Sequence, residues 1–207
     1  MKSLKMLASF GLALSLMIGF SAWDNTSAGG IEVGDLIPMM GKDMKSVSGD
    51  QLHLRELHKE NGLLVVFSCN TCPFVIQWED RYNELYELCE SNNVGMVLVN
   101  SNEAKRSGAD SYEAMKSKAD EQEYKMPYVV DQDHMVADAF GAKTTPHVFL
   151  FDRDAKLAYK GAIDDNSKDK TAVTEHYLTD AINAMVKGET ISPATTKALG
   201  CSIKRVQ

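Results

Sequence analysis

Short apolar runs alternate with amphipathic or polar stretches along most of this chain. The apolar runs have the length of buried strands and lie at 63–67, 96–100, 147–152 and 156–160. The intervening stretches have helical length or spacing and predict helices at 54–59, 73–90, 109–124, 135–140 and 172–187. A turn at Gly34-Asp35 and a hairpin-like stretch at 47–52 precede them. This alternation predicts an α/β fold in which helices flank a central mixed sheet on both faces.

The first thirty residues have the pattern of a targeting segment. Two lysines precede a short apolar core at 7–20, and Ser21-Ala22 or Ser27-Ala28 provide small residues for cleavage. The core is too short for a comfortable membrane span, and no basic residues follow it directly. We expect residues 1–28 to be a signal peptide and the protein to be periplasmic or otherwise exported. An uncleaved N-terminal anchor is the alternative.

The rest of the chain is long enough to form one domain with its own core. Of the 207 residues, about 180 remain after the targeting segment. We assign 31–190 to this domain and 191–207 to a C-terminal tail that contains Cys201. The sequence has 22 basic and 29 acidic residues, which give a formal net charge of −7. This balance, without a basic patch, argues against nucleic acid or an anionic membrane surface as a partner.

The motif with the clearest chemistry is Cys69-Asn70-Thr71-Cys72-Pro73, at the predicted junction of a strand and a helix. Two thiols at this spacing can form and break a small disulfide ring, which is the basis of thiol–disulfide exchange. The unpaired N–H groups and the dipole at a helix N-terminus favour a thiolate there. We therefore expect Cys69 to be the more exposed thiol, to have the lower pKa and to attack. Cys72 is expected to be the resolving thiol.

Other uses of a C-x-x-C pair fit this sequence less well. A structural zinc site needs four ligands, and the remaining cysteines, Cys89 and Cys201, are isolated. Haem attachment requires a histidine directly after Cys72, where Pro73 stands. A purely structural disulfide would close a loop too small to constrain the unfolded chain much. No metal or other cofactor is therefore expected, and Cys89 is expected in the core.

A second motif, Thr144-Thr145-Pro146-His147, precedes an apolar run. Proline cannot donate to a strand ladder, so Pro146 is expected at the start of the strand, at an edge or at a bulge, with a cis peptide. The C-x-x-C at a helix start and the Thr-Pro before a strand resemble the thioredoxin-like superfamily. A closer resemblance, over about residues 31–205, is to a subgroup of bacterial redoxin-domain proteins, whose broader family includes alkyl-hydroperoxide reductases and thiol-specific antioxidants. It is carried by the stretches FSCNTCPF, VLVNSNE, MPYVVDQD, VADAFGAKTTPHVFLFD, GAIDDN and GCSIK.

The resemblance implies a thioredoxin-like fold with an N-terminal hairpin and an extra helical insertion around 101–126. It assigns Thr145 and Pro146 to substrate docking, with the Thr145 backbone pairing to an extended substrate chain as an added strand. It also makes Cys201, in the GCSIK motif, a candidate third redox thiol or a partner in a tail disulfide. An ordinary packed or free thiol is the alternative for this residue.

The implied function is that of an exported thiol–disulfide oxidoreductase that uses Cys69 and Cys72. Its substrates would be protein thiols or disulfides, with a redox partner that supplies or accepts electrons; reductases, oxidases and isomerases share this arrangement. One alternative is a thiol peroxidase, although the Thr or Ser expected three positions before the reactive cysteine is here Val66 or Cys69. Another is a thiol-based Cu(I)-binding chaperone. Three further side chains are candidates for moving protons near the pair: His147, Glu79 and Glu103.

Overall fold

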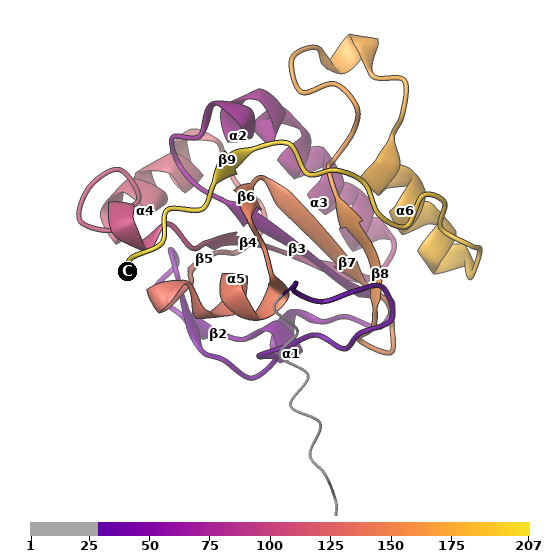
Figure 1. Cartoon of the computed structure of the whole chain (residues 1–207), viewed down its shortest axis with the longest axis horizontal. Helices are drawn as coiled ribbons and strands as arrows, with labels where there is room; N and C mark the ends of the chain where they lie inside the picture. The colour runs from indigo at the N-terminus through magenta and orange to yellow at the C-terminus, as the bar shows by residue number, and fades with distance from the viewer. Residues whose placement is uncertain (1–28) are drawn as a thin grey trace, which may run out of the picture.

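The structure of the protein, a computed structural model, describes residues 29–207 (Figure 1). The predicted signal peptide at 1–28 lies outside the described residues, so export stays a prediction. Within residues 29–207, no helix combines the length and the apolar character that crossing a bilayer requires.

The main sheet of the described residues contains seven strands in the order β2-β1-β5-β4-β3-β7-β8. Its central strand, β3 (Gly62–Ser68), is parallel to β4 (Val94–Asn100) and antiparallel to β7 (His147–Phe151). Every residue of β3 and β4 is buried, as in strands that are covered on both faces. The other strands of this sheet are β1 (Met44–Ser46), β2 (Gln51–Leu52), β5 (Tyr128–Val130) and β8 (Leu157–Gly161). A separate pair is formed by β6 (Thr144–Thr145) and β9 (Cys201–Ser202).

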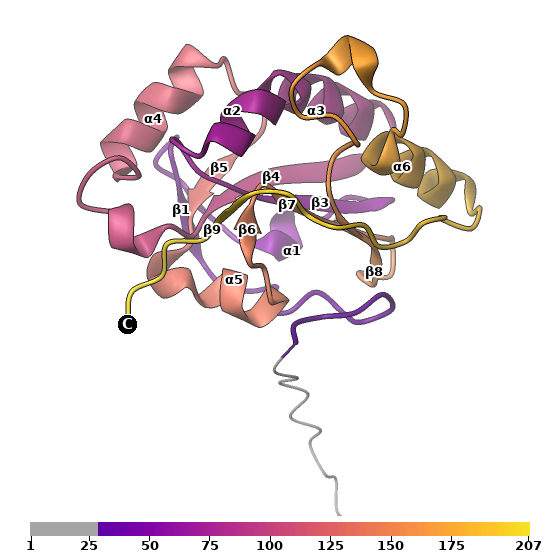
Figure 2. The ribbon, with the colours of Figure 1, turned by 45° about the horizontal axis from the view of Figure 1, so that its top comes forward.

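Helices cover both faces of the sheet, as Figure 2 shows. One face carries α2 (Pro73–Trp78), α3 (Tyr82–Ser91), α4 (Tyr112–Glu121) and α6 (Tyr177–Lys187); the other carries α1 (Leu54–Leu57) and α5 (Met135–Phe140). Successive side chains of β3 point to opposite faces. Leu64 and Val66 therefore pack in the core under α3 and α6. Leu63 and Phe67 pack in the second core, which includes Phe140 of α5.

The structure confirms the predicted α/β class with a central mixed sheet between helices. The N-terminal hairpin is present as β1 and β2, and the insertion holds α4 and a 3₁₀ turn, η2 (Glu103–Lys105). The sequence pattern does not predict β5, β6 or β9, because each has only two or three residues and pairs with a distant segment. The last helix begins at Tyr177 rather than at 172, after the 3₁₀ turn η4 (Lys170–Ala172). A further 3₁₀ turn, η3 (Gln132–His134), precedes α5.

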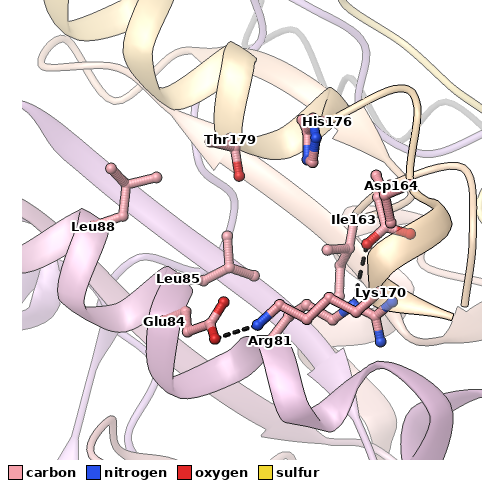
Figure 3. A pocket seen from close by; sticks show the side chains of 10 residues that line it. Arg81, Glu84, Leu85, Leu88, Ile163, Asp164, Lys170, His176 and Thr179 are labelled. Carbon is pink, nitrogen blue, oxygen red and sulfur yellow. Dashed lines mark hydrogen bonds and ion pairs between the residues drawn. The ribbon is translucent and has the colours of Figure 1, made fainter.

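The helix predicted at 73–90 is interrupted in the structure. A 3₁₀ turn, η1 (Glu79–Arg81), separates α2 from α3. Asp164, in the loop after β8, accepts a hydrogen bond from Trp78 Nε1 at 2.7 Å and lies 3.3 Å from Arg81 Nε. Figure 3 shows this Arg81–Asp164 pair beside a cavity of about 280 Å³. These tertiary contacts connect the loop after β8 to the break between the helices. The periodicity of apolar residues does not predict such contacts.

Substitution of Gly95 in β4 tests the close packing of α1 on the sheet. A Cβ at this position would lie 1.8 Å from the Leu57 carbonyl oxygen at the end of α1. Because backbone would have to move, we expect Gly95→Ala to lower the free energy of unfolding by about 3 kcal/mol or more. Gly108→Ala is the control: its Cβ would have no atom nearer than 4.0 Å, and we expect a change within about 1 kcal/mol. Urea unfolding followed by circular dichroism compares the two, and equal stabilities would contradict this packing.

Candidate active site

The C-x-x-C motif lies where β3 leads into α2. β3 ends at Ser68, and α2 begins at Pro73 with Cys72 as its N-cap residue. Proline is well suited to the first helical position, because the N–H that it lacks would have no partner there. The short strands β6 and β9 lie beside the start of α2 (Figure 1). The motif therefore meets two segments that are distant in the sequence.

Both thiols of the motif are free and buried. Cys69 is 2% exposed and Cys72 is 5% exposed. Cys69 Sγ lies 3.3 Å from the Thr145 hydroxyl oxygen, and Cys72 Sγ lies 3.1 Å from the Thr145 carbonyl oxygen. The Thr145–Pro146 peptide is cis, as expected from the sequence. The structure thus brings together the two cysteines and the predicted docking residues.

The two thiols have opposite pKa shifts. Hydrogen bonding with Cys69 is the main cause that lowers the pKa of Cys72 from 9.0 to about 4, and the Cys201 thiol and the Val75 backbone N–H contribute. The same hydrogen bond, reinforced by burial, raises the pKa of Cys69 above the ordinary range. Cys69 is therefore not the more exposed of the two thiols, contrary to expectation, and the hydrogen bond between them favours Cys72 rather than Cys69 as the thiolate. Because α2 begins at Pro73, Cys72 is the residue at the helix end.

A buried carboxylate, Asp110, holds the turn between the two cysteines. Its Oδ1 accepts hydrogen bonds from the Asn70 backbone N–H and from Asn100 Nδ2, each at 2.8 Å. Its Oδ2 accepts a hydrogen bond from Asn102 Nδ2 at 3.0 Å. The negative charge of Asp110 also contributes to the raised pKa of Cys69. Asp110 therefore positions the turn and opposes ionisation of the first cysteine.

The sequence analysis does not identify Asp110, because no motif marks it within the insertion. The carboxylates that the sequence suggests are engaged in other pairs. Glu79 lies 2.8 Å from Lys118 Nζ, and Glu103 pairs with an arginine three residues away. Burial lowers the pKa of His147 to about 4, so this imidazole is neutral at neutral pH. Only the tertiary structure shows which acidic side chain reaches the cysteines.

The backbone edge beside the two cysteines is covered by the C-terminal tail. β6 pairs with β9 in an antiparallel register that places Thr145 opposite Cys201. The sequence predicts that an extended substrate chain pairs with the Thr145 backbone, and in the structure the chain's own tail occupies this edge. Cys201 is partly exposed, and its thiol interacts with the Cys72 sulfur. The candidate third thiol therefore lies at the site, next to Cys72.

A cavity of about 200 Å³ opens between these elements. Its lining combines the three cysteines of the site with two lysines, Lys105 and Lys204. Nearby positive charge favours thiolates, and here it is local, since the chain as a whole is acidic. Among residues 29–207, no group of three or more His, Cys, Asp or Glu side chains is arranged to hold a metal ion. Cys89 is fully buried in the core under α3, as predicted.

Comparison with known proteins identifies the family of this chain. The model of the Redoxin family matches residues 32–178. An uncharacterized conserved protein from Geobacillus kaustophilus is 31% identical, with 84% of this chain and 93% of that chain covered at a TM-score of 0.78. A hypothetical protein from Sinorhizobium meliloti is 29% identical, with 85% and 96% covered at a TM-score of 0.78. None of the curated proteins matches the chain.

The fold extends to more distant structures. A putative thiol:disulfide interchange protein from Chlorobium tepidum is 17% identical, with 75% of this chain and 99% of that chain covered at a TM-score of 0.59. At this identity the likeness concerns the fold alone. It confirms the predicted thioredoxin-like fold.

Because the pKa of Cys72 is lowered, we expect its thiol to stay ionised well below neutral pH. Because this pKa is about 4, the ultraviolet absorbance of the thiolate in the reduced protein should stay constant from about pH 8 to about pH 5. It should be lost as the pH falls through the pKa, because Cys72 then takes up a proton.

The Cys69→Ala variant removes the hydrogen bond that contributes most, so the pKa of Cys72 should rise and thiolate absorbance at about pH 6 should fall. Cys89→Ala is the control, because burial raises the pKa of Cys89 to about 12 and it supplies no thiolate in this range. A wild-type protein whose thiolate absorbance appears only in alkaline solution would contradict the assignment.

Proposed function

Because the chain belongs to the Redoxin family, we propose that it is an exported thiol–disulfide oxidoreductase that exchanges disulfides with protein partners through Cys69 and Cys72. Family membership supports a thiol-based oxidoreductase in general. The observation that supports the finer proposal is the meeting of two free thiols at one residue, Thr145, beside the N-terminus of α2. Two sulfurs that both contact the same residue can close a disulfide with little movement of the chain.

The pKa values suggest the order of the steps. Cys72, as the thiolate, attacks a sulfur of the partner's disulfide, and a mixed disulfide forms while the partner's other sulfur leaves. The Cys69 thiol then loses its proton and attacks Cys72 Sγ. The partner is released with both of its sulfurs reduced, and the Cys69–Cys72 disulfide carries away the oxidising equivalents. This order reverses the roles that the motif alone predicts, and the reverse sequence of steps would oxidise a partner.

Export would determine which partners the protein needs. A bacterial periplasm is kept oxidising, so a dithiol there becomes a disulfide unless a redox partner reduces it. The proposed protein would therefore take electrons from one partner and pass them to another, or run in the opposite direction. No nucleic acid, and no membrane contact beyond the N-terminal segment, forms part of this proposal.

The burial of the site favours one second candidate, a thiol peroxidase. Cys69 and Cys72 are 2% and 5% exposed, and the cavity of about 200 Å³ beside them suits a small hydroperoxide better than a folded protein. A low-pKa Cys72 would be oxidised to the sulfenic acid, and Cys69 would then condense with it to form the disulfide. The residue three positions before Cys72 is a cysteine rather than Thr or Ser, which counts against this mechanism.

The dithiol mechanism predicts that disulfide reduction needs both an attacking and a resolving thiol. With dithiothreitol as the electron donor, we expect Cys72→Ser to slow the reduction of insulin by about 100-fold or more, because the attacking thiol is lost. We expect the same loss when Cys69→Ser is combined with Cys201→Ser, because no thiol then remains beside Cys72 to resolve the mixed disulfide. Cys89→Ala is the matched control and should retain most of the activity, since Cys89 lies in the core away from the site. Thermal unfolding of each variant checks that it is folded.

The same proteins separate the two candidate functions. We expect hydrogen peroxide to oxidise Cys72 at a rate similar to that of an ordinary thiolate, measured by trapping the sulfenic acid with dimedone. Insulin reduction that depends on Cys72 and on a resolving thiol, together with slow peroxide oxidation, would support the oxidoreductase. Rapid sulfenic acid formation at Cys72 with no insulin reduction would replace it by the peroxidase.

A further inference from the structure

Three thiols meet at the site, and Cys72 lies between the other two. Cys69 and Cys201 each interact with the Cys72 sulfur. Independent geometry places the three thiols around Thr145 and beside one cavity. Cys72 Sγ lies 3.1 Å from the Thr145 carbonyl oxygen, and the strand register places Cys201 opposite Thr145.

We propose that Cys201 is a second resolving thiol, which exchanges with Cys72 and moves the disulfide from the Cys69–Cys72 pair to a Cys72–Cys201 pair. The proposal rests on the proposed function, because that function supplies the Cys69–Cys72 disulfide. It adds a third redox residue to the site and a role for the C-terminal tail.

The step is a simple exchange between one thiol and one disulfide. The Cys201 thiolate attacks Cys72 Sγ, so the Cys72–Cys201 bond forms while the Cys69–Cys72 bond breaks. Cys69 leaves as a thiolate and takes up the proton that Cys201 has lost. The number of electrons on the protein does not change, so the step needs no further oxidant or reductant.

The surroundings of Cys201 favour its ionisation once Cys72 is oxidised. In the reduced protein the pKa of Cys201 is raised, chiefly by its hydrogen bond with Cys72 and by burial. When Cys72 is part of a disulfide, its sulfur carries no thiolate charge. The hydrogen bond with Cys72 then no longer raises the pKa of Cys201. Lys204 and the Phe74 backbone N–H, in the first turn of α2, lower the pKa of Cys201 and remain in place.

The tail is held on both sides of Cys201. On the C-terminal side, the Ile203 side chain is buried in the core, and the Lys204 backbone N–H donates to Asn102 Oδ1 at 2.8 Å. On the N-terminal side, Gly200 lies so close to β6 that a Cβ would stand 2.3 Å from the Thr145 carbonyl oxygen. The absence of a side chain at Gly200 therefore permits the approach that delivers the thiol. A thiol held in place reacts faster than one on a free tail, because the entropy of bringing the groups together is already lost.

The exchange makes the disulfide accessible to the partner that reduces the protein again. Cys69 and Cys72 are both buried, whereas Cys201 is partly exposed. A reducing partner could therefore reach the sulfur of Cys201 while the original pair stays covered. The tail would carry the oxidising equivalent from the buried pair to the surface.

Disulfide mapping tests the proposal directly. The reduced protein is oxidised with one equivalent of diamide, free thiols are blocked with N-ethylmaleimide, and unreduced peptides are identified by mass spectrometry. We expect both the Cys69–Cys72 and the Cys72–Cys201 peptides from the wild type. We expect Cys69→Ser to form the Cys72–Cys201 disulfide within single chains, at a rate that does not depend on protein concentration. Cys89 should be recovered as a free thiol throughout.

The same experiment separates failure of this inference from failure of the proposed function. If the Cys69–Cys72 disulfide forms and insulin is reduced, but Cys201 is always recovered as a free thiol, the inference is overturned and the proposed function stands. If no disulfide involving Cys72 forms within the chain, both are overturned.

A second variant tests the strand pairing while keeping Cys72 and Cys201, the two thiols that form the disulfide. In the Cys69→Ser background, Gly200→Ala should slow formation of the Cys72–Cys201 disulfide by about tenfold or more, because the new Cβ pushes β9 away from β6. Ser202→Ala changes the same strand without this clash and should leave the rate within about twofold. Equal rates in the Gly200 and Ser202 variants would overturn the role proposed for the strand pairing.

Discussion

The burial of β3 on both faces of the sheet is the constraint on which the site depends. Residues 63–67 are completely buried, and a shift by one residue would exchange the side chains of the two cores. The register of β3 against β7 places Phe67 opposite His147. Continued by two residues, this antiparallel register brings Cys69 toward Thr145, and Cys69 Sγ lies 3.3 Å from the Thr145 hydroxyl oxygen. The position of the reactive pair is therefore a consequence of how the centre of the sheet packs.

The chemistry of the site belongs to a cluster rather than to one residue. Cys72 has a lowered pKa because its neighbours donate hydrogen bonds to it, and Cys69 has a raised pKa because it shares that interaction beside the charge of Asp110. One negative charge is thus favoured in the reduced pair, and a second is opposed. A single thiolate beside a neutral thiol is the state in which attack and resolution can follow one another.

The sequence predicts the fold class well because periodicity reports burial. The apolar runs that become β3, β4 and β7 are buried along their whole length or nearly so, and their lengths distinguish them from helices. The break between α2 and α3 is not predictable in this way. It coincides with contacts from Trp78 and Arg81 to Asp164, which lies more than eighty residues further along the chain.

The sequence by itself determined that two thiols lie at a strand–helix junction and that a Thr-Pro precedes a later strand, because spacing and residue type are local properties. Only the tertiary structure shows where α2 begins and which groups face each sulfur, and these determine the acidity of the two thiols. Only the tertiary structure also placed Asp110 beneath the turn and Cys201 beside Cys72. Both come from segments with no local signal of their position, and long-range strand pairing and buried hydrogen bonds brought them to the site.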